Sequence, residues 1–253
     1  MALDEYTADQ LITWYERIEK GILLFGEHVP LTRENETLIA PILASYLLDA
    51  CGLIDSVFRD MTLDPTVVSS KTVARKDCTI IEFAELHAKS LDLPNTRSTM
   101  LVSPPRYRNP FSPWTSILTS GKYSDLDWWM TYNHLKHNRL ANIKSCTLGT
   151  TLDATCALHQ VISRRLEHVP LLIRRRWFPS KSWPIDHVIE EASAGRLPGL
   201  FVVQTELFAT PVGSNTMLQS TEWQFPTDVA NLNSKLSWFK CKDDFYRFLG
   251  STG

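Results

Sequence analysis

The apolar residues in the first two thirds of the chain recur at intervals of three and four, which is the period of an amphipathic helix. From this pattern we predict five helices, each with an apolar stripe that faces a common core. They cover residues 8–25, 35–61, 79–91, 125–142 and 150–168. The spacing therefore predicts a bundle of helices.

Prolines separate the third and fourth predicted helices. We expect residues 92–122 to be irregular and extended, because a proline disfavours helix at the residue before it. The same segment contains Tyr107, Phe111 and Trp114, which favour a structured loop packed against the bundle. The prolines are Pro94, Pro104, Pro105, Pro110 and Pro113.

The pattern changes after the fifth predicted helix. Residues 199–207 are rich in β-forming side chains and predict a strand. Residues 217–224 are its predicted partner, across a polar turn at 211–215. Two short helices are also predicted in this part of the chain, at 186–194 and 238–249.

These elements place the chain in the mainly α class, with a small C-terminal β element. Its 253 residues are enough for one large domain or two small ones. We divide it where the pattern changes. Residues 1–171 form the predicted helical bundle, including the proline-rich loop at 92–122. Residues 172–253 form an α+β extension that packs on the bundle or binds a partner.

The composition is that of a soluble globular protein, with 43% hydrophobic and 21% charged residues. A net charge of −2 excludes a broadly basic coat for nucleic acid but leaves a local basic patch open. The five cysteines are scattered without a C-x-x-C pair, which is typical of a reducing compartment. The first residues are acidic and polar, unlike a signal peptide. We therefore expect a cytoplasmic protein.

One apolar segment, at residues 38–58, is nearly long enough to cross a bilayer. It contains Asp49 and Asp55, and a carboxylate near the centre of a membrane helix costs about 2.5–3.5 kcal/mol. Pro41 and Gly52 weaken a membrane-spanning helix further. We expect a buried helix of the bundle and no membrane partner.

The densest group of polar and aromatic residues lies in the fourth predicted helix, in the run WWMTYNHLKHNR. On a continuous helix, Trp129, Asn133, Lys136 and His137 share one face, and Tyr132, Lys136 and Arg139 form an adjoining stripe. An amide, an imidazole and two fixed cations are suited to holding a phosphate. A histidine such as His137 can also transfer a proton near neutral pH.

The pattern W-W-x-x-Y-N-x-x-K-H-x-R follows a loop rich in proline and aromatic residues. It resembles a family of uncharacterised bacterial proteins that share the motif Y-N-x-x-K-H-x-R. The apolar run LIAPILASYLLDACGLIDSVFRD is similar to the second helix of that family, and the likeness covers about residues 8–168. That family resembles in turn the HEPN superfamily of helical bundles, found in toxin–antitoxin, CRISPR-associated and phage-abortive systems.

The resemblance implies a HEPN-like homodimer that cleaves RNA without a metal ion, in a toxin or phage-defence setting. HEPN ribonucleases carry the pattern R-[polar]-x-x-x-H on a helix. Here Asn133 is the polar residue and His137 the histidine, while Tyr132 occupies the arginine position. The implied roles are general acid or base for His137, orientation of that ring by Asn133, and charge neutralisation by Lys136 and Arg139.

A second hypothesis keeps the helical bundle without catalysis. In it, Asn133 and His137 bridge neighbouring helices by hydrogen bonds, and the adjacent tryptophans anchor the packing. The C-terminal extension then binds a protein or nucleic-acid partner. The arginine runs at 164–165 and 174–176 fit two interpretations, which are contact with RNA phosphates and a solvated helix end.

The sequence contains no motif for a metal or a cofactor. It lacks H-E-x-x-H, paired Cys/His spacing, the glycine-rich loops that bind nucleotides, and G-x-S-x-G. We therefore expect neither a metal nor a cofactor. The common nucleotide-binding and hydrolase folds are excluded on the same ground.

Overall fold

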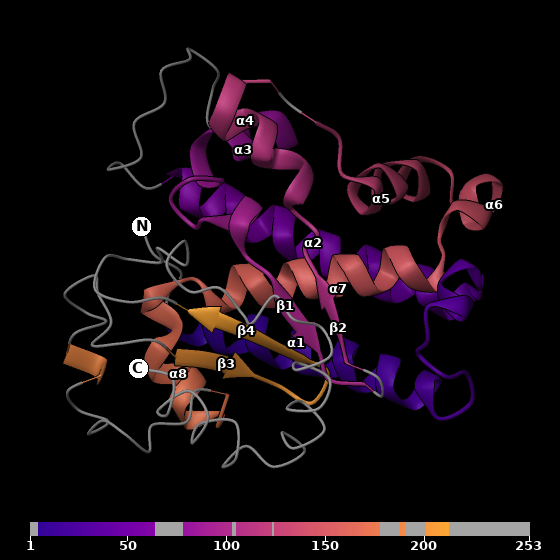
Figure 1. Cartoon of the computed structure of the whole chain (residues 1–253), viewed down its shortest axis with the longest axis horizontal. Helices are drawn as coiled ribbons and strands as arrows, with labels where there is room; N and C mark the ends of the chain where they lie inside the picture. The colour runs from indigo at the N-terminus through magenta and orange to yellow at the C-terminus, as the bar shows by residue number, and fades with distance from the viewer. Residues whose placement is uncertain are drawn as a thin grey trace.

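A computed structural model shows a mainly helical fold with a small four-stranded antiparallel sheet (Figure 1). At this level the predicted fold class is confirmed. The structure describes residues 5–63, 78–102, 105–122, 124–177, 188–190 and 201–212.

Three long helices form the core of the bundle: α1 (Glu5–Gly26), α2 (Pro41–Leu63) and α7 (Leu148–Ser163). α2 packs against both α1 and α7. In Figure 1, α2 and α7 run side by side across the middle of the molecule. Their apolar stripes meet there, and Ile12 and Leu47 have no exposed surface. Burying each such side chain stabilises the fold by about 1.5–3 kcal/mol.

The second helix begins at Pro41, later than the sequence pattern predicts. Residues Glu34–Thr37 instead form a short 3-10 turn, η1, and Leu38 after it is extended. Proline suits the first position of a helix, where no backbone N–H is needed, and it disfavours helix just before it. Ile39 forms a β-bridge with Thr147, which ties this entry to the start of α7.

Among the described residues, α2 is the one helix long and apolar enough to cross a membrane by length and composition. Half of its most apolar window is buried inside the protein. Arg59 donates to Asp55 at 3.0 Å, one turn away on the same helix. Its packing against α1 and α7 is that of a core helix in a bundle.

α7 begins at a capping box in which Thr147 and Thr150 exchange side-chain and backbone hydrogen bonds. It is buried on nearly every side, since it contacts α1, α2 and the sheet. The fifth predicted helix extends too far, because α7 ends at Ser163. A 3-10 turn, η6 (Leu166–His168), and the short helix α8 (Val169–Arg174) follow it.

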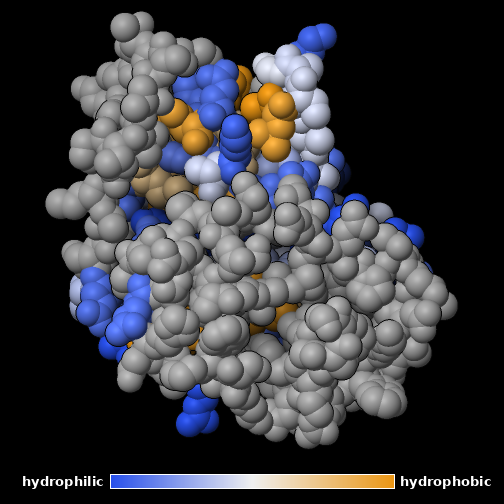
Figure 2. Space-filling view, turned by 60° about the vertical axis from the view of Figure 1, so that its left-hand side comes forward, coloured by the Kyte–Doolittle hydropathy of each residue, from blue (hydrophilic) through white to orange (hydrophobic). Residues whose placement is uncertain are grey.

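The prediction of one helix over 125–142 is wrong. The chain breaks at Asn138, whose backbone is not helical and whose side chain accepts a hydrogen bond from the Ala141 amide. Figure 2 shows small apolar patches beside hydrophilic side chains in the upper part of this view. Ile81 and Leu118 are among the exposed large apolar residues. The shorter helices and turns are α3 (Ile80–His87), η3 (Leu93–Asn95), η4 (Ser112–Trp114), α4 (Thr115–Ser120), α5 (Asp127–His137), α6 (Arg139–Asn142) and η5 (Ile143–Ser145).

The sheet joins two distant parts of the chain in the strand order β2-β1-β4-β3. The expectation that residues 92–122 are irregular throughout is therefore wrong. Thr99 pairs with Tyr107 on one side and with Ala209 on the other. The strands are β1 (Ser98–Met100), β2 (Arg106–Arg108), β3 (Phe201–Gln204) and β4 (Phe208–Val212).

The predicted position of the hairpin turn is wrong. β3 pairs with β4 across a short turn at residues 205–207. Pro211, which was expected in the turn, lies within β4 opposite Val202. Two other predicted elements, at 217–224 and 238–249, lie outside the described residues. Of the predicted helix at 186–194, residues 188–190 are described and are helical.

The arginines at 164–165 are buried, so neither the RNA-contact nor the solvated-end interpretation holds for them. Arg164 has no exposed surface, and its guanidinium donates to the Leu91 carbonyl at 2.5 Å. Asp92 lies 3.6 Å from the same guanidinium, yet burial lowers the pKa of Arg164 to about 10. Arg165 forms an ion pair with Glu167 at 2.5 Å. These charges hold elements of the fold together.

Candidate functional site

α5 presents an aromatic and apolar face to the bundle. Trp128, Trp129, Tyr132 and Leu135 are all buried. The Trp128 indole donates to the Pro110 carbonyl at 3.0 Å, and the Trp129 and Tyr132 rings lie 5.0 Å apart, centre to centre. The interpretation of the paired tryptophans as packing anchors is confirmed.

The solvent side of α5 carries the central part of the predicted site. Lys136 and His137 are exposed, and Asn133, one turn before His137, is half-buried. The Lys136 ammonium lies 5.5 Å from the centre of the Tyr132 ring, a cation–π distance that keeps it beside this face. Within the described residues, the His137 ring takes part in no hydrogen bond or ion pair. It is therefore open to a ligand.

Arg139 does not share this helix. α5 ends at His137, Asn138 caps the next helix, and Arg139 is the first residue of α6. Its guanidinium donates to the Ser45 hydroxyl on α2 at 2.7 Å. The predicted helical stripe that joins Arg139 to Tyr132 is therefore wrong, because it assumed a continuous helix.

Side-chain amides fix the corner between α5 and α6. The Asn142 amide donates to the carbonyls of His134 and Asn138, at 3.0 and 2.9 Å. Asn138 in turn caps the Ala141 amide at 3.2 Å. These bonds satisfy backbone groups that a broken helix leaves without partners. The exposed His137 thus lies at a turn of defined backbone.

Tyr132 faces the bundle and not the solvent. It is 7% exposed, and burial raises its pKa, as does the negative charge of Asp55. Its hydroxyl is therefore neutral at physiological pH and does not supply the positive charge of an arginine. Its contribution to the face is positional, through the ammonium of Lys136 that lies over its ring.

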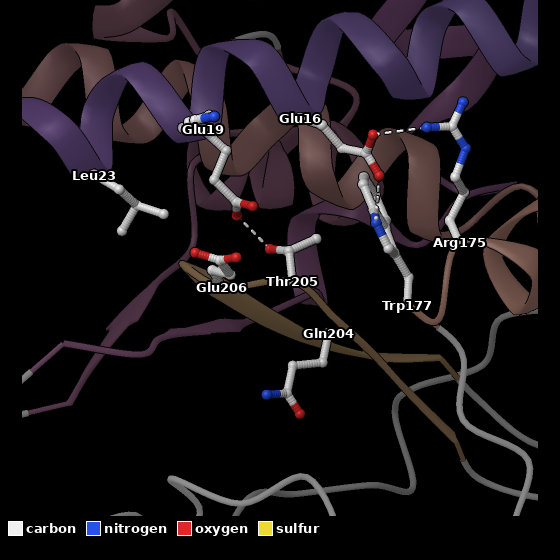
Figure 3. Close-up of a pocket in the computed structure, with 9 residues that line it drawn as sticks. Glu16, Glu19, Leu23, Arg175, Trp177, Gln204, Thr205 and Glu206 are labelled. Atoms are coloured by element: carbon white, nitrogen blue, oxygen red, sulfur yellow. Dashed lines mark hydrogen bonds and ion pairs between the residues drawn. The ribbon is translucent and has the colours of Figure 1, made fainter.

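A pocket of about 390 Å³ lies in another part of the molecule, between α1 and the turn from β3 to β4 (Figure 3). The sequence does not predict this pocket, because its residues come from distant segments of the chain. One signal is present, since Glu19 follows Ile18 on the buried side of α1, where a carboxylate is out of place. The lining includes Glu16, Glu19, Leu23, Trp177, Thr205 and Glu206.

No protein-family model, curated protein or solved structure matches the chain. Function is therefore inferred from the geometry of the exposed face of α5 and its corner with α6. Over the described segments, no group of three His, Cys, Asp or Glu side chains is placed to hold a metal ion.

Proposed function

We propose that the chain is a HEPN-like, metal-independent endoribonuclease that acts as a homodimer in a toxin or phage-defence system. The observation that supports this is the exposure of Lys136 and His137 at a fixed helix corner, while the other side of α5 provides the packing. A histidine that only bridged helices would have its ring nitrogens paired inside the protein. The mainly helical fold is compatible with this proposal.

The proposed reaction is attack of a ribose 2′-hydroxyl on the adjacent phosphodiester. His137 accepts the 2′-hydroxyl proton, the 2′-oxygen bonds to phosphorus, and the bond from phosphorus to the 5′-oxygen breaks. The 5′-oxygen takes a proton from water or from the partner's imidazolium. The products are a 2′,3′-cyclic phosphate and a 5′-hydroxyl, and the step consumes no cofactor.

Lys136 supplies the charge that this reaction needs at the phosphate. Its ammonium forms charge-assisted hydrogen bonds, which strengthen as negative charge develops on the phosphate oxygens. Tyr132 holds the ammonium in place, so Lys136 takes the part that an arginine plays in HEPN ribonucleases. Arg139 supplies a second cation from α6. Asn133 lies one turn before His137, and no hydrogen bond joins the two side chains in the described structure, so the proposed orientation of the ring by Asn133 applies to the complex with RNA.

An RNA cleavage assay on the wild type and on His137→Ala tests the proposal, with His134→Ala as the matched control. Both histidines are exposed near the end of α5, so both variants are expected to melt like the wild type. In EDTA we expect RNA cleavage by the wild type and by His134→Ala, and a loss of about 100-fold or more in His137→Ala. A wild type that leaves RNA intact, or a His137→Ala protein with full activity, contradicts the proposal.

One observation favours a second candidate, a helical module that binds nucleic acid or a protein without catalysis. Tyr132 is buried at the position where HEPN ribonucleases carry an arginine, and Arg139 already donates a hydrogen bond to Ser45. In this case the exposed cations bind phosphate, or the C-terminal extension binds a protein. RNA that binds in a Lys136-dependent way and is recovered intact would favour the module over the enzyme.

A further inference from the structure

The pocket beside α1 is of the size that binds small molecules, since such sites hold about 300–1,000 Å³ and this one about 390 Å³. Figure 3 shows Glu16, Glu19 and Leu23 along α1, with Arg175 and Trp177 at one end and the β3–β4 turn opposite. Parts of the chain distant in sequence therefore enclose a single polar cavity. It is separate from the exposed face of α5.

One wall of the pocket is a closed ionic network. Arg175 donates to Glu16 at 2.7 Å and to Asp9 at 2.8 Å, and the Trp177 indole donates to the other oxygen of Glu16 at 3.1 Å. Both oxygens of Glu16 are therefore in use, and the two carboxylates exceed the charge of Arg175 by one negative charge. This wall shapes the pocket and adds to its negative charge.

Glu19 is a buried carboxylate that lines the pocket. It is 5% exposed, and its Oε1 accepts hydrogen bonds from the Tyr15 hydroxyl at 2.8 Å, the Leu207 amide at 3.1 Å and the Thr205 hydroxyl. Three donors on one oxygen fix the orientation of the carboxylate. The backbone amide of Glu206 is a further donor to this carboxylate. Glu19 lines the pocket, and Figure 3 shows its carboxylate on the side of α1 that faces the β3–β4 turn.

A second carboxylate reaches the same part of the pocket. Glu206, in the β3–β4 turn, is exposed, and in Figure 3 its carboxylate is directed toward that of Glu19. The remaining cation of the lining is Lys20, which is exposed and keeps its ammonium in water. The part of the pocket around Glu19 therefore carries excess negative charge.

We propose that this pocket binds a small organic cation through a primary ammonium group held between the carboxylates of Glu19 and Glu206. An ammonium has three donors and no acceptor, which matches two carboxylates, since these groups only accept hydrogen bonds and carry about four acceptor sites each. Leu23 and Trp177 provide apolar contact for a short alkyl chain. A metal ion fits less well, because the described residues include no group of three ligating side chains placed for one.

Titration calorimetry of the full chain with 1,4-diaminobutane tests this proposal, with 1,4-butanediol as the uncharged probe. Glu19→Gln keeps an oxygen for the three donors and removes the charge, and Glu206→Gln removes the exposed charge with little risk to folding. Glu27→Gln is the matched control, since Glu27 is an exposed carboxylate just beyond the end of α1 and outside the pocket. Circular dichroism and melting curves establish that each variant is folded.

We expect one diamine per chain, no binding of the diol, and about tenfold or more weaker binding in Glu19→Gln and in Glu206→Gln. Binding by Glu27→Gln should equal that of the wild type. The proposal is overturned if the wild type binds no diamine at about 10 mM, if the diol binds as well, or if Glu27→Gln weakens binding as much as the pocket variants. If Glu19→Gln does not fold, Glu206→Gln decides alone.

Discussion

Buried His87 makes the fold less stable as the pH is lowered. His87 is 1% exposed, its ring stacks on Phe58 at 5.6 Å between centres, and one ring nitrogen lies 2.9 Å from the Thr62 hydroxyl. Burial, together with a smaller effect of the charge of Arg165, lowers its pKa from 6.5 to about 4. The folded state therefore keeps His87 neutral in a pH range where the unfolded chain binds a proton.

The sign and the size of the effect follow from linkage. As pH falls from 7 to 5, the unfolded state takes up a proton at a site with a pKa of about 6.5, while the folded state takes up almost none. The free energy of unfolding contributed by His87 therefore falls by about 2 kcal/mol over this interval. Substitution by phenylalanine keeps an aromatic ring against Phe58 and removes the titration.

Urea unfolding of the wild type and His87→Phe at pH 7 and at pH 5 measures this difference. We expect the loss of stability between the two pH values to be about 2 kcal/mol smaller in His87→Phe, even if that variant is less stable at both. Buried His159 and His168 contribute in the same direction, but they remain in both proteins and cancel. His28 is exposed, so His28→Phe is the matched control, and we expect it to lose as much stability between pH 7 and pH 5 as the wild type. An identical pH dependence in wild type and His87→Phe would refute the reasoning.

Two further changes have equally definite outcomes. Glu36 accepts hydrogen bonds from both Arg106 and Arg108 at 2.5 Å. Glu36→Gln should therefore lower the free energy of unfolding, measured in urea, by about 2 kcal/mol, whereas Glu34→Gln, at a neighbouring exposed position, should leave the unfolding midpoint unchanged. Equal midpoints for the two variants would show that the two ion pairs of Glu36 are not stabilising. The described cysteines are all buried, so a Cys241→Ser protein should resist a thiol reagent when native and react with four equivalents in denaturant. Rapid labelling of the native protein would contradict their burial.

Periodicity predicts elements whose stabilisation is spread over many residues. The long apolar stripe of α1 is such a case, since it contains buried positions from Ala8 to Ile22 and no strong competing signal. The break at Asn138 was not predictable, because the surrounding polar run also fits a continuous helix. A single side-chain cap and the Asn142 bonds decide it, and these exist only once the corner has formed. Cap chemistry of this kind is invisible to a hydrophobic pattern.

The sheet and the pocket depend on contacts between distant segments. β1 has three residues, too few for a pattern of alternation, and it becomes a strand by pairing with β2 and with β4. The exposure of Lys136 and His137 was partly foreseeable, because Trp128, Tyr132 and Leu135 mark the opposite stripe. The pocket was not, since no local pattern brings Glu19 against a turn near the other end of the chain.

The central claim is that His137 promotes attack by a ribose 2′-hydroxyl. The most direct measurement uses an RNA strand with a single 2′-deoxy nucleotide at a site that is cleaved in the all-ribose strand, incubated in EDTA with wild type, His134→Ala and His137→Ala. We predict cleavage at that site in the all-ribose strand by the first two proteins, with a 2′,3′-cyclic phosphate product, and none in the deoxy strand or with His137→Ala. Cleavage at the deoxy position, or equal cleavage by His137→Ala, would contradict the account.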